Sequence, residues 1–128
     1  MTDIVLDASA ILAFLQQEKG ADIVEDLLPD AAVSANNLAE VVAKLVDRGV
    51  PTDDIDQIIA AFDFSILDVG KEDAVANGLL RGATRGAGLS LGDRSCIALA
   101  QRLALPVLTT DRAWGQLQGL GVEVRRVR

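Results

Sequence analysis

Residues 88–114, GLSLGDRSCIALAQRLALPVLTTDRAW, contain the clearest passage from a helix to a strand in the chain. The periodicity predicts an amphipathic helix over 93–103, and the apolar run at 106–109 predicts a buried strand. Asp93 stands where this helix begins, and Asp111 follows the end of this strand. The segment therefore places one carboxylate at a helix start and another beyond a strand end.

The same alternation continues outward in both directions. Strands are predicted at 3–7, 31–35, 64–68 and 121–127, and helices at 8–17, 20–28, 37–48, 52–62, 71–86 and 111–118. Strands that alternate with helices favour a parallel sheet with helices on both faces. We therefore expect an α/β fold. The 128 residues contain no evident linker or repeat, so we expect a single domain over residues 1–128.

Two more acids lie in the first third of the chain at comparable places. Asp7, in IVLDAS, ends the first predicted strand, and Glu40, in NNLAEVV, lies early in the helix at 37–48. In a parallel α/β sheet, strand C-termini and helix N-termini meet at one edge. Carboxylates from Asp7, Glu40, Asp93 and Asp111 would repel one another there unless a cation held them. The pattern therefore indicates a divalent-metal site.

Composition restricts the kind of site further. The chain has no histidine, which excludes serine–histidine–aspartate triads, HExxH motifs and histidine-bound zinc. A metal must then be held by oxygen ligands, which favours Mg²⁺ or Mn²⁺. The single cysteine, Cys96, allows no internal disulfide and fits a reducing compartment. We expect Cys96 and the single tryptophan, Trp114, to be core residues.

No apolar run approaches the roughly 18–20 residues needed to cross a bilayer. The N-terminus, MTDIVLDASA, carries acids where a signal peptide carries lysines. We therefore expect a cytoplasmic protein without membrane contact.

The net charge of −7 argues by itself against nucleic-acid binding, because phosphate contacts need lysine and arginine. Part of that charge belongs to the predicted metal site, where a cation would neutralise it. Arginines also gather near this edge and at the C-terminus, at positions 81, 85, 94, 112, 125, 126 and 128. Arg94 and Arg112 are candidates for substrate-phosphate contacts, and solvation is the alternative for Arg112.

Each acid also has a purely structural interpretation. Asp7 and Asp93 can be helix N-caps. Asn37 and Glu40 fit a capping box, with Asn37 as the cap and Glu40 reaching back to the backbone. Ser9 can cap a helix or hold a metal-bound water. Four such acids at one predicted edge favour the metal site over four separate caps.

At these residues the chain resembles the PIN-domain family and, within it, the VapC-type toxins of bacterial toxin–antitoxin pairs. The matching segments are IVLDASAILAFL, SANNLAEVVAKL, residues 88–114 and the closing GVEVRRV. They cover almost the whole chain in the family's order. The resemblance implies a three-layer α/β/α sandwich around a central parallel sheet.

The resemblance also implies roles for individual residues. Asp7, Glu40, Asp93 and Asp111 correspond to the family's acidic quartet, with Asp7, Asp93 and Asp111 as ligands of Mg²⁺ or Mn²⁺. Ser9 and Asn37 occupy its supporting positions. Many relatives carry a further acid shortly after the third, whereas Arg94, Ser95 and Cys96 follow Asp93 here. One or two metal ions therefore remain as alternatives.

The activity implied is a Mg²⁺- or Mn²⁺-dependent endoribonuclease that cleaves RNA phosphodiester bonds with metal-activated water. The implied partners are an RNA substrate, a cognate antitoxin and a second copy of the chain in a homodimer. Two alternatives share the fold: a PIN-like nuclease in RNA processing outside a toxin–antitoxin pair, and a PIN-like module that binds RNA or protein without cleavage.

Three other α/β classes do not match. A response-regulator receiver needs a lysine after its fifth strand, and Lys19, Lys44 and Lys71 lie at no strand end. A haloacid-dehalogenase-type phosphatase needs an aspartate where this chain has Ser9. A dinucleotide-binding domain needs GxGxxG after its first strand, and GATRGAG at 82–88 has another spacing and place.

Overall fold

The computed structural model describes residues 2–112, 114, 117 and 119–127. Its strands are β1 (Ile4–Leu6), β2 (Ala31–Ser34), β3 (Ser65–Leu67), β4 (Val107–Thr109) and β5 (Val124–Arg126). Its helices are α1 (Ala8–Leu15), α2 (Ala21–Leu27), α3 (Ala35–Asp47), α4 (Thr52–Ala60), α5 (Lys71–Thr84) and α6 (Leu91–Leu103), with 3₁₀ turns at Leu28–Asp30 and Arg85–Ala87. Strands and helices alternate as the sequence predicts.

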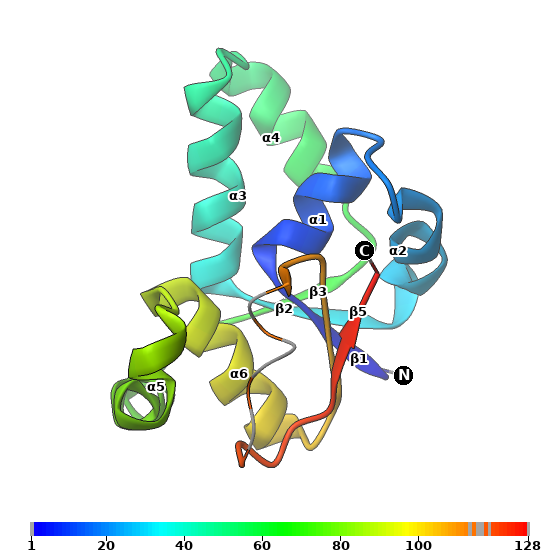
Figure 1. The fold of residues 1–128 in the computed structure, drawn as a ribbon. Helices are drawn as coiled ribbons and strands as arrows, with labels where there is room; N and C mark the ends of the chain where they lie inside the picture. Colours follow the sequence, from blue (N-terminus) through cyan, green and yellow to red (C-terminus); the bar gives the residue numbers. More distant parts are fainter. Residues whose placement is uncertain (1, 113, 115–116, 118, 128) are drawn as a thin grey trace.

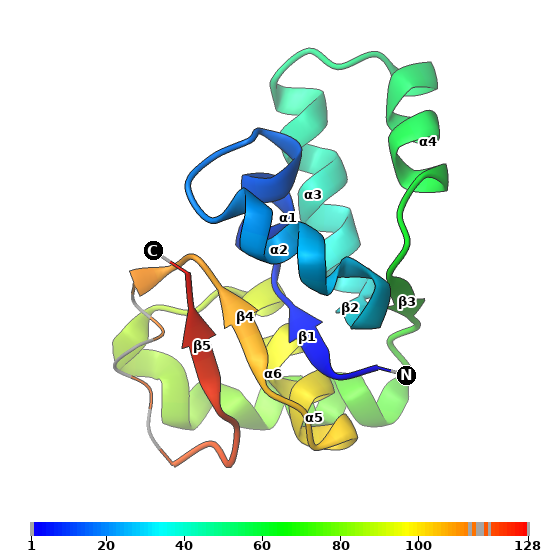
Figure 2. The same cartoon turned by 90° about the vertical axis from the view of Figure 1, so that its right-hand side faces the viewer.

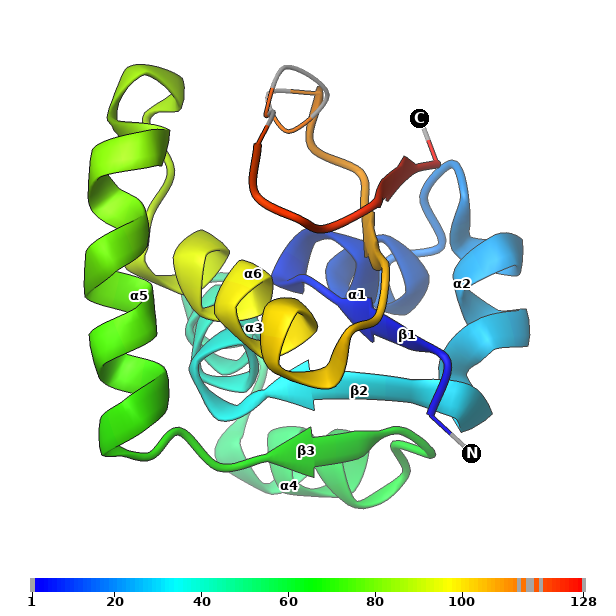
Figure 3. The same cartoon turned by 90° about the horizontal axis from the view of Figure 1, so that it is seen from below.

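The five strands form one sheet in the order β3-β2-β1-β4-β5, and every neighbouring pair is parallel. Helices α1 to α4 lie on one face of the sheet, and α5 and α6 lie on the other (Figures 1 and 2). The view from below shows α6 against the sheet, with α5 beside it (Figure 3). The predicted α/β/α sandwich with a parallel sheet is confirmed.

Each face of the sheet has its own hydrophobic core. Along β1, Ile4 and Leu6 pack with α1, α2 and α3, whereas Val5 packs with Ile97 and Cys96 of α6. This alternation follows from the two-residue period of a strand. A strand that is buried on both faces reads as a continuous apolar run, which explains the sequence IVL. Cys96 and Trp114 are core residues, as predicted.

Several predicted boundaries are wrong, including the start of α3, at Ala35 instead of residue 37, and the ends of α1 and α4, each two residues earlier than predicted. Helix α6 begins at Leu91 instead of residue 93, because Ser90 caps it. The predicted helix over 71–86 ends at Thr84 and tightens into the 3₁₀ turn at Arg85–Ala87. Strand β5 begins at Val124 instead of residue 121. The predicted helix at 111–118 includes positions 113, 115, 116 and 118, which lie outside the described residues.

Among the described residues, no helix has both the length and the apolar character needed to cross a membrane.

Candidate active site at the carboxyl edge of the sheet

Asp7 is the first residue after β1 and the N-cap of α1, so its predicted capping role is confirmed. Its Oδ1 accepts hydrogen bonds from the Ala10 amide at 2.9 Å and from Ser9 Oγ at 2.7 Å. Only 2% of Asp7 is exposed. A carboxylate so deeply buried needs hydrogen-bond donors on both oxygens, because burial removes its hydration.

Thr109, the last residue of β4, supplies the donor for the second oxygen. Its Oγ1 donates to Asp7 Oδ2 at 2.5 Å and accepts the Asp111 amide at 3.0 Å. The Thr110 amide donates to Ser9 Oγ at 3.1 Å. Hydrogen bonds that involve side chains thus connect the residues that follow β1 and β4, in addition to the backbone hydrogen bonds between the strands. No functional role was predicted for Thr109, although it ends a buried apolar run two residues before Asp111.

Glu40 lies on α3 and reaches the first turn of α6. Its Oε1 accepts a hydrogen bond from Asn37 Nδ2 at 2.9 Å, and the same Nδ2 donates to the Gly92 carbonyl at 2.9 Å. A Cβ on Gly92 would lie 1.9 Å from Glu40 Oε1. Glycine at this position lets the carboxylate lie directly against the backbone, and a larger residue would require Glu40 to move.

The capping box predicted for Asn37 and Glu40 is wrong. Helix α3 begins at Ala35, and its N-cap is Ser34, whose Oγ accepts the Asn36 amide at 3.3 Å. Asn37 and Glu40 therefore lie within the helix, where the spacing of three residues lets their side chains meet. The Asn37–Glu40 pair is free to make contacts with α6 instead of closing its own helix end.

Asp93 is the third residue of α6, and the predicted N-cap at this position is also wrong. Ser90 is the cap: its Oγ accepts the Asp93 amide at 3.1 Å, and Asp93 Oδ2 accepts the Ser90 amide at 3.0 Å. This reciprocal pair is a capping box. It places an acid in the first turn, where the helix dipole favours negative charge.

The charge of Asp93 acts on the pKa of two of the other acids. Burial raises the pKa of Asp7 to about 6, and the charge of Asp93 contributes to the rise, while the bonds from Thr109, Ser9 and Ala10 oppose it. Burial, and then Asp93, raise the pKa of Glu40, against the Asn37 hydrogen bond and the charge of Lys44.

The thiol of Cys96 lies behind these acids. Burial raises its pKa, and the charges of Asp7, Asp93 and Glu40 add to the effect. Asp93 therefore lies within electrostatic reach of both Asp7 and Glu40, and all three acids act on Cys96. Asp111 is exposed just beyond β4, at the same edge of the sheet.

The donor set suits a hard divalent cation in kind, because every candidate ligand is a carboxylate oxygen. Asn37 adds a buried Oδ1 that has no hydrogen-bond partner among the described residues. Within the described part of the chain, however, no three Asp, Glu, Cys or His residues form a cluster that could hold a metal. Asp93 Oδ2 is held by Ser90, and Glu40 Oε1 by Asn37, so the ligands are near one another without converging.

The two candidate phosphate contacts have different surroundings. Arg94 is only 8% exposed, and its guanidinium donates to Asn77 Oδ1 at 3.1 Å and to the Leu89 carbonyl at 3.3 Å. This burial contradicts a substrate contact for Arg94. Arg112 is exposed beyond β4, so its phosphate contact stays a prediction.

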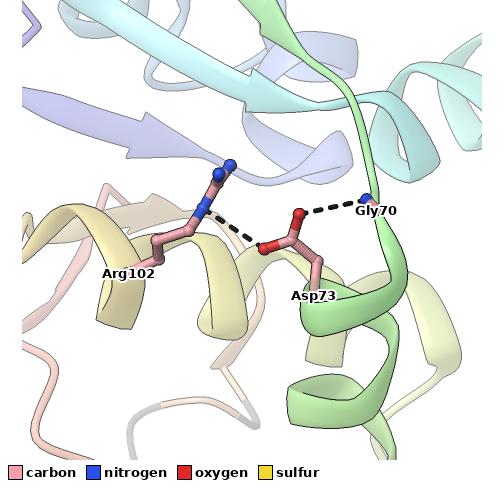
Figure 4. Close-up of polar contacts among 3 residues, drawn as sticks. All are labelled: Gly70, Asp73 and Arg102. Atoms are coloured by element: carbon pink, nitrogen blue, oxygen red, sulfur yellow. Dashed lines mark hydrogen bonds and ion pairs between the residues drawn. The ribbon is translucent and has the colours of Figure 1, made fainter.

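An open hollow of about 450 Å³ lies at another place, where β3 meets α5. Two of its charged groups form an ion pair: Arg102 Nε lies 3.2 Å from Asp73 Oδ1, and Asp73 Oδ2 accepts the Gly70 amide at 3.1 Å (Figure 4). None of the four candidate acids lines this hollow. The candidate site is therefore the acidic edge of the sheet.

The family model of the PIN domain matches residues 4–120, and the chain belongs to this family. Its curated relatives are VapC-type members: ribonuclease VapC42 from Mycobacterium tuberculosis is 32% identical over 114 residues, covering 81% of this chain and 87% of the relative.

Solved structures agree with the fold. DNA-bound VapBC from Salmonella typhimurium superposes with a TM-score of 0.78 at 16% identity, over 100% of both chains. VapBC-5 from Mycobacterium tuberculosis superposes with a TM-score of 0.66 at 30% identity, over 99% of this chain and 100% of that one.

Proposed function

We propose that this chain is a VapC-type ribonuclease, the toxin of a toxin–antitoxin pair, and that it cleaves RNA with the help of Mg²⁺ or Mn²⁺. The observation that carries the proposal is the position of Asp93, within electrostatic reach of both Asp7 and Glu40, at the carboxyl edge of a PIN-family sheet. A ribonuclease name for the 32% identical relative supports the substrate class.

Asp7, Asp93 and Asp111 would hold the cation, and Ser9 and Asn37 would support them. Bound at this edge, a divalent cation would offset the negative charge of the carboxylates and of the RNA phosphate.

The protein's own groups supply the rest of the chemistry. Ser9, Ala10 and Thr109 direct three donors at Asp7 and so favour its ionised form near neutral pH. The raised pKa of Glu40 suits a base that accepts a proton from the attacking water on its carboxylate. Asn37 fixes the direction of that carboxylate through Oε1. Arg112, exposed beside Asp111, would contact a substrate phosphate.

A protein partner follows from the same assignment. Two of the solved relatives are VapBC assemblies, which supports an antitoxin for this chain. An acidic site on a chain of net charge −7 suits a basic segment of that antitoxin. We include a homodimer in the proposal, and light scattering of the purified protein tests it.

The test is cleavage of total cellular RNA by purified, antitoxin-free protein with Mg²⁺, with Mn²⁺ and with EDTA. Asp7→Asn is the site variant, and Asp53→Asn, an exposed acid in the first turn of α4, is the matched control. We expect discrete fragments from the wild type and the control, and none from Asp7→Asn or with EDTA. Equal cutting by Asp7→Asn would refute the site. No cutting by the wild type, together with RNA binding, would favour a binding module.

A further inference from the structure

Buried polar side chains connect three helices behind the first turn of α6. Asn36 Nδ2 of α3 donates to Ser95 Oγ at 2.8 Å, and Asn77 Nδ2 of α5 donates to the same oxygen at 2.7 Å. Asn77 Oδ1 accepts Arg94 Nε, and Arg94 also donates to the Leu89 carbonyl. Asn77 and Ser95 are each 5% exposed. Polar groups are costly at such burial unless they are hydrogen-bonded, so this network is a built feature of the fold.

Asparagine side chains from two helices, α5 and α3, hold two successive carbonyls of α6. Asn77 Nδ2 donates to the Leu91 carbonyl at 2.9 Å, and Asn37 Nδ2 donates to the Gly92 carbonyl at 2.9 Å. Asp93 is the next residue. The backbone that carries Asp93 is thus fixed by α5 at one residue and by α3 at the following one.

The first turn of α6 lies directly against the Glu40 side chain. The Glu40 carboxylate occupies the place where a side chain of residue 92 would begin, with Oε1 1.9 Å from an ideal Cβ. A shift of the turn toward α3 would press the Gly92 backbone against Glu40, and a shift toward α5 would draw Asp93 away from Glu40. The contact made by Asn77 sets the position of the turn on the α5 side.

We propose that Asn77 is a positioning residue of the site: through Leu91 and Ser95 it holds the first turn of α6 so that Asp93 stays in register with Glu40 and Asp7. This inference rests on the proposed ribonuclease function and deepens it. Asn77 acts on the reaction only through Asp93. No role was predicted for Asn77, because its partners Leu91 and Ser95 lie 14 and 18 positions further along the chain, on a different helix.

The experiment compares Asn77→Ala and Ser95→Ala with Thr84→Val. Thr84 lies on the same helix as Asn77, is 1% exposed, and donates its Oγ1 to the Leu80 carbonyl at 2.8 Å. Its replacement by valine removes one buried hydrogen bond that lies entirely within α5. The substrate is a short RNA that spans a cut site mapped in total RNA. Melting temperature, kcat, KM and amide exchange at Gly92 and Asp93 are measured for each protein.

We expect Asn77→Ala to lower kcat by about 10- to 100-fold, because small displacements of reacting groups cost that much, while KM stays within about threefold. Ser95→Ala should also lower kcat while KM stays nearly constant, but the loss of kcat should be smaller. Amide exchange at Gly92 and Asp93 should be faster in both variants. Thr84→Val should keep kcat within about twofold of the wild type, even if its melting temperature falls as much as that of Asn77→Ala.

Two results would overturn the positioning role. One is a folded Asn77→Ala protein with wild-type kcat. The other is a Thr84→Val protein whose kcat falls as much as that of Asn77→Ala, since the loss would then reflect general destabilisation. A wild-type protein that cleaves no RNA under any metal condition would instead refute the proposed function on which the inference rests.

Discussion

Replacing Asp7 by asparagine should stabilise the metal-free protein at neutral pH while it abolishes activity. Asp7 is 2% exposed, and burial raises its pKa to about 6 from an ordinary value of 3.8. Near pH 7 the Asp7 carboxylate is therefore charged in the folded protein, although burial disfavours that charge. Asparagine has nearly the same shape and carries no charge. Its Oδ1 can still accept from Ser9 and Ala10, and the Thr109 hydroxyl can turn to accept its amide.

The sign and size of the expected stability change follow from the pKa of Asp7 in the unfolded chain and in the folded protein. Between pH 3.8 and about 6 the folded protein binds this proton more tightly than the unfolded chain does. The advantage of the folded state is complete below pH 3.8 and is lost as the pH rises through about 6. The difference between the two values corresponds to about 3 kcal/mol at most. For a chain of this length, that is an increase in melting temperature of up to about 10 °C.

Urea unfolding of wild type and Asp7→Asn in EDTA, at steps from pH 4.5 to pH 8, measures this difference directly. The free energy of unfolding of Asp7→Asn should exceed that of the wild type by an amount that grows with pH, by about 2 kcal/mol over this range. Asp53→Asn, at an exposed position, should stay within about 0.5 kcal/mol of the wild type at every pH.

A second arm repeats the measurement with Mn²⁺. A cation held by Asp7 stabilises the wild type by mass action and should leave Asp7→Asn almost unchanged. The difference in the free energy of unfolding between the two proteins should therefore shrink or change sign. A destabilised Asp7→Asn in EDTA, or a gain that does not vary with pH, would refute the reasoning, because the charge of Asp7 would then not be the cause.

The remaining predictions concern neighbours of the same carboxylates. Gly92→Ala should destabilise the protein by about 1–3 kcal/mol in urea unfolding, because the new methyl group meets the Glu40 carboxylate held by Asn37. Gly78→Ala, with nothing within 4 Å of its added carbon, should instead stabilise α5 by up to about 1 kcal/mol, and the opposite order would contradict the packing described. Thr109→Val removes the donor to Asp7 Oδ2, so it should raise the pKa of Asp7 further and cost about 1–3 kcal/mol at pH 7.5. That cost should shrink in an Asp7→Asn background, and an equal cost in both backgrounds would show that Thr109 acts independently of Asp7.

The sheet was predictable because its strands are short apolar runs that lie between amphipathic helices. The apolar runs IVL and PVLT are suited to burial between two layers of helices. The helices that separate the strands in the sequence favour a parallel arrangement. The start of α6 was not predicted, although Ser90 and Asp93 have the spacing of a capping box. Gly92 in the first turn weakens the helical pattern, and it is there to make room for Glu40.

The placement of the acids at one edge of the sheet was predictable for the same topological reason, but their hydrogen-bond partners were not. Asp7 follows β1, and parallel strands bring its carboxylate to the edge where α6 begins. Nothing local in the sequence pairs Asp7 with Thr109, which is 102 positions away, or Asn77 with Ser95. Arg94 shows the converse error: its charge indicated a surface contact, whereas the fold uses it inside the protein to satisfy Asn77.

The errors share one physical origin that bears on function. The alternative interpretation of Asn37 as a cap and the prediction of Arg94 as a phosphate contact both assumed that polar side chains bond to nearby backbone, water or substrate. Here they bond across helices, because the first turn of α6 must be held between α3 and α5 with Glu40 directly against its backbone. Such bonds are costly to bury and difficult to replace one at a time. A fold that needed only a packed core would place leucine or alanine at these positions. The polar residues therefore indicate that the position of Asp93, more than the stability of α6, is what this part of the sequence maintains.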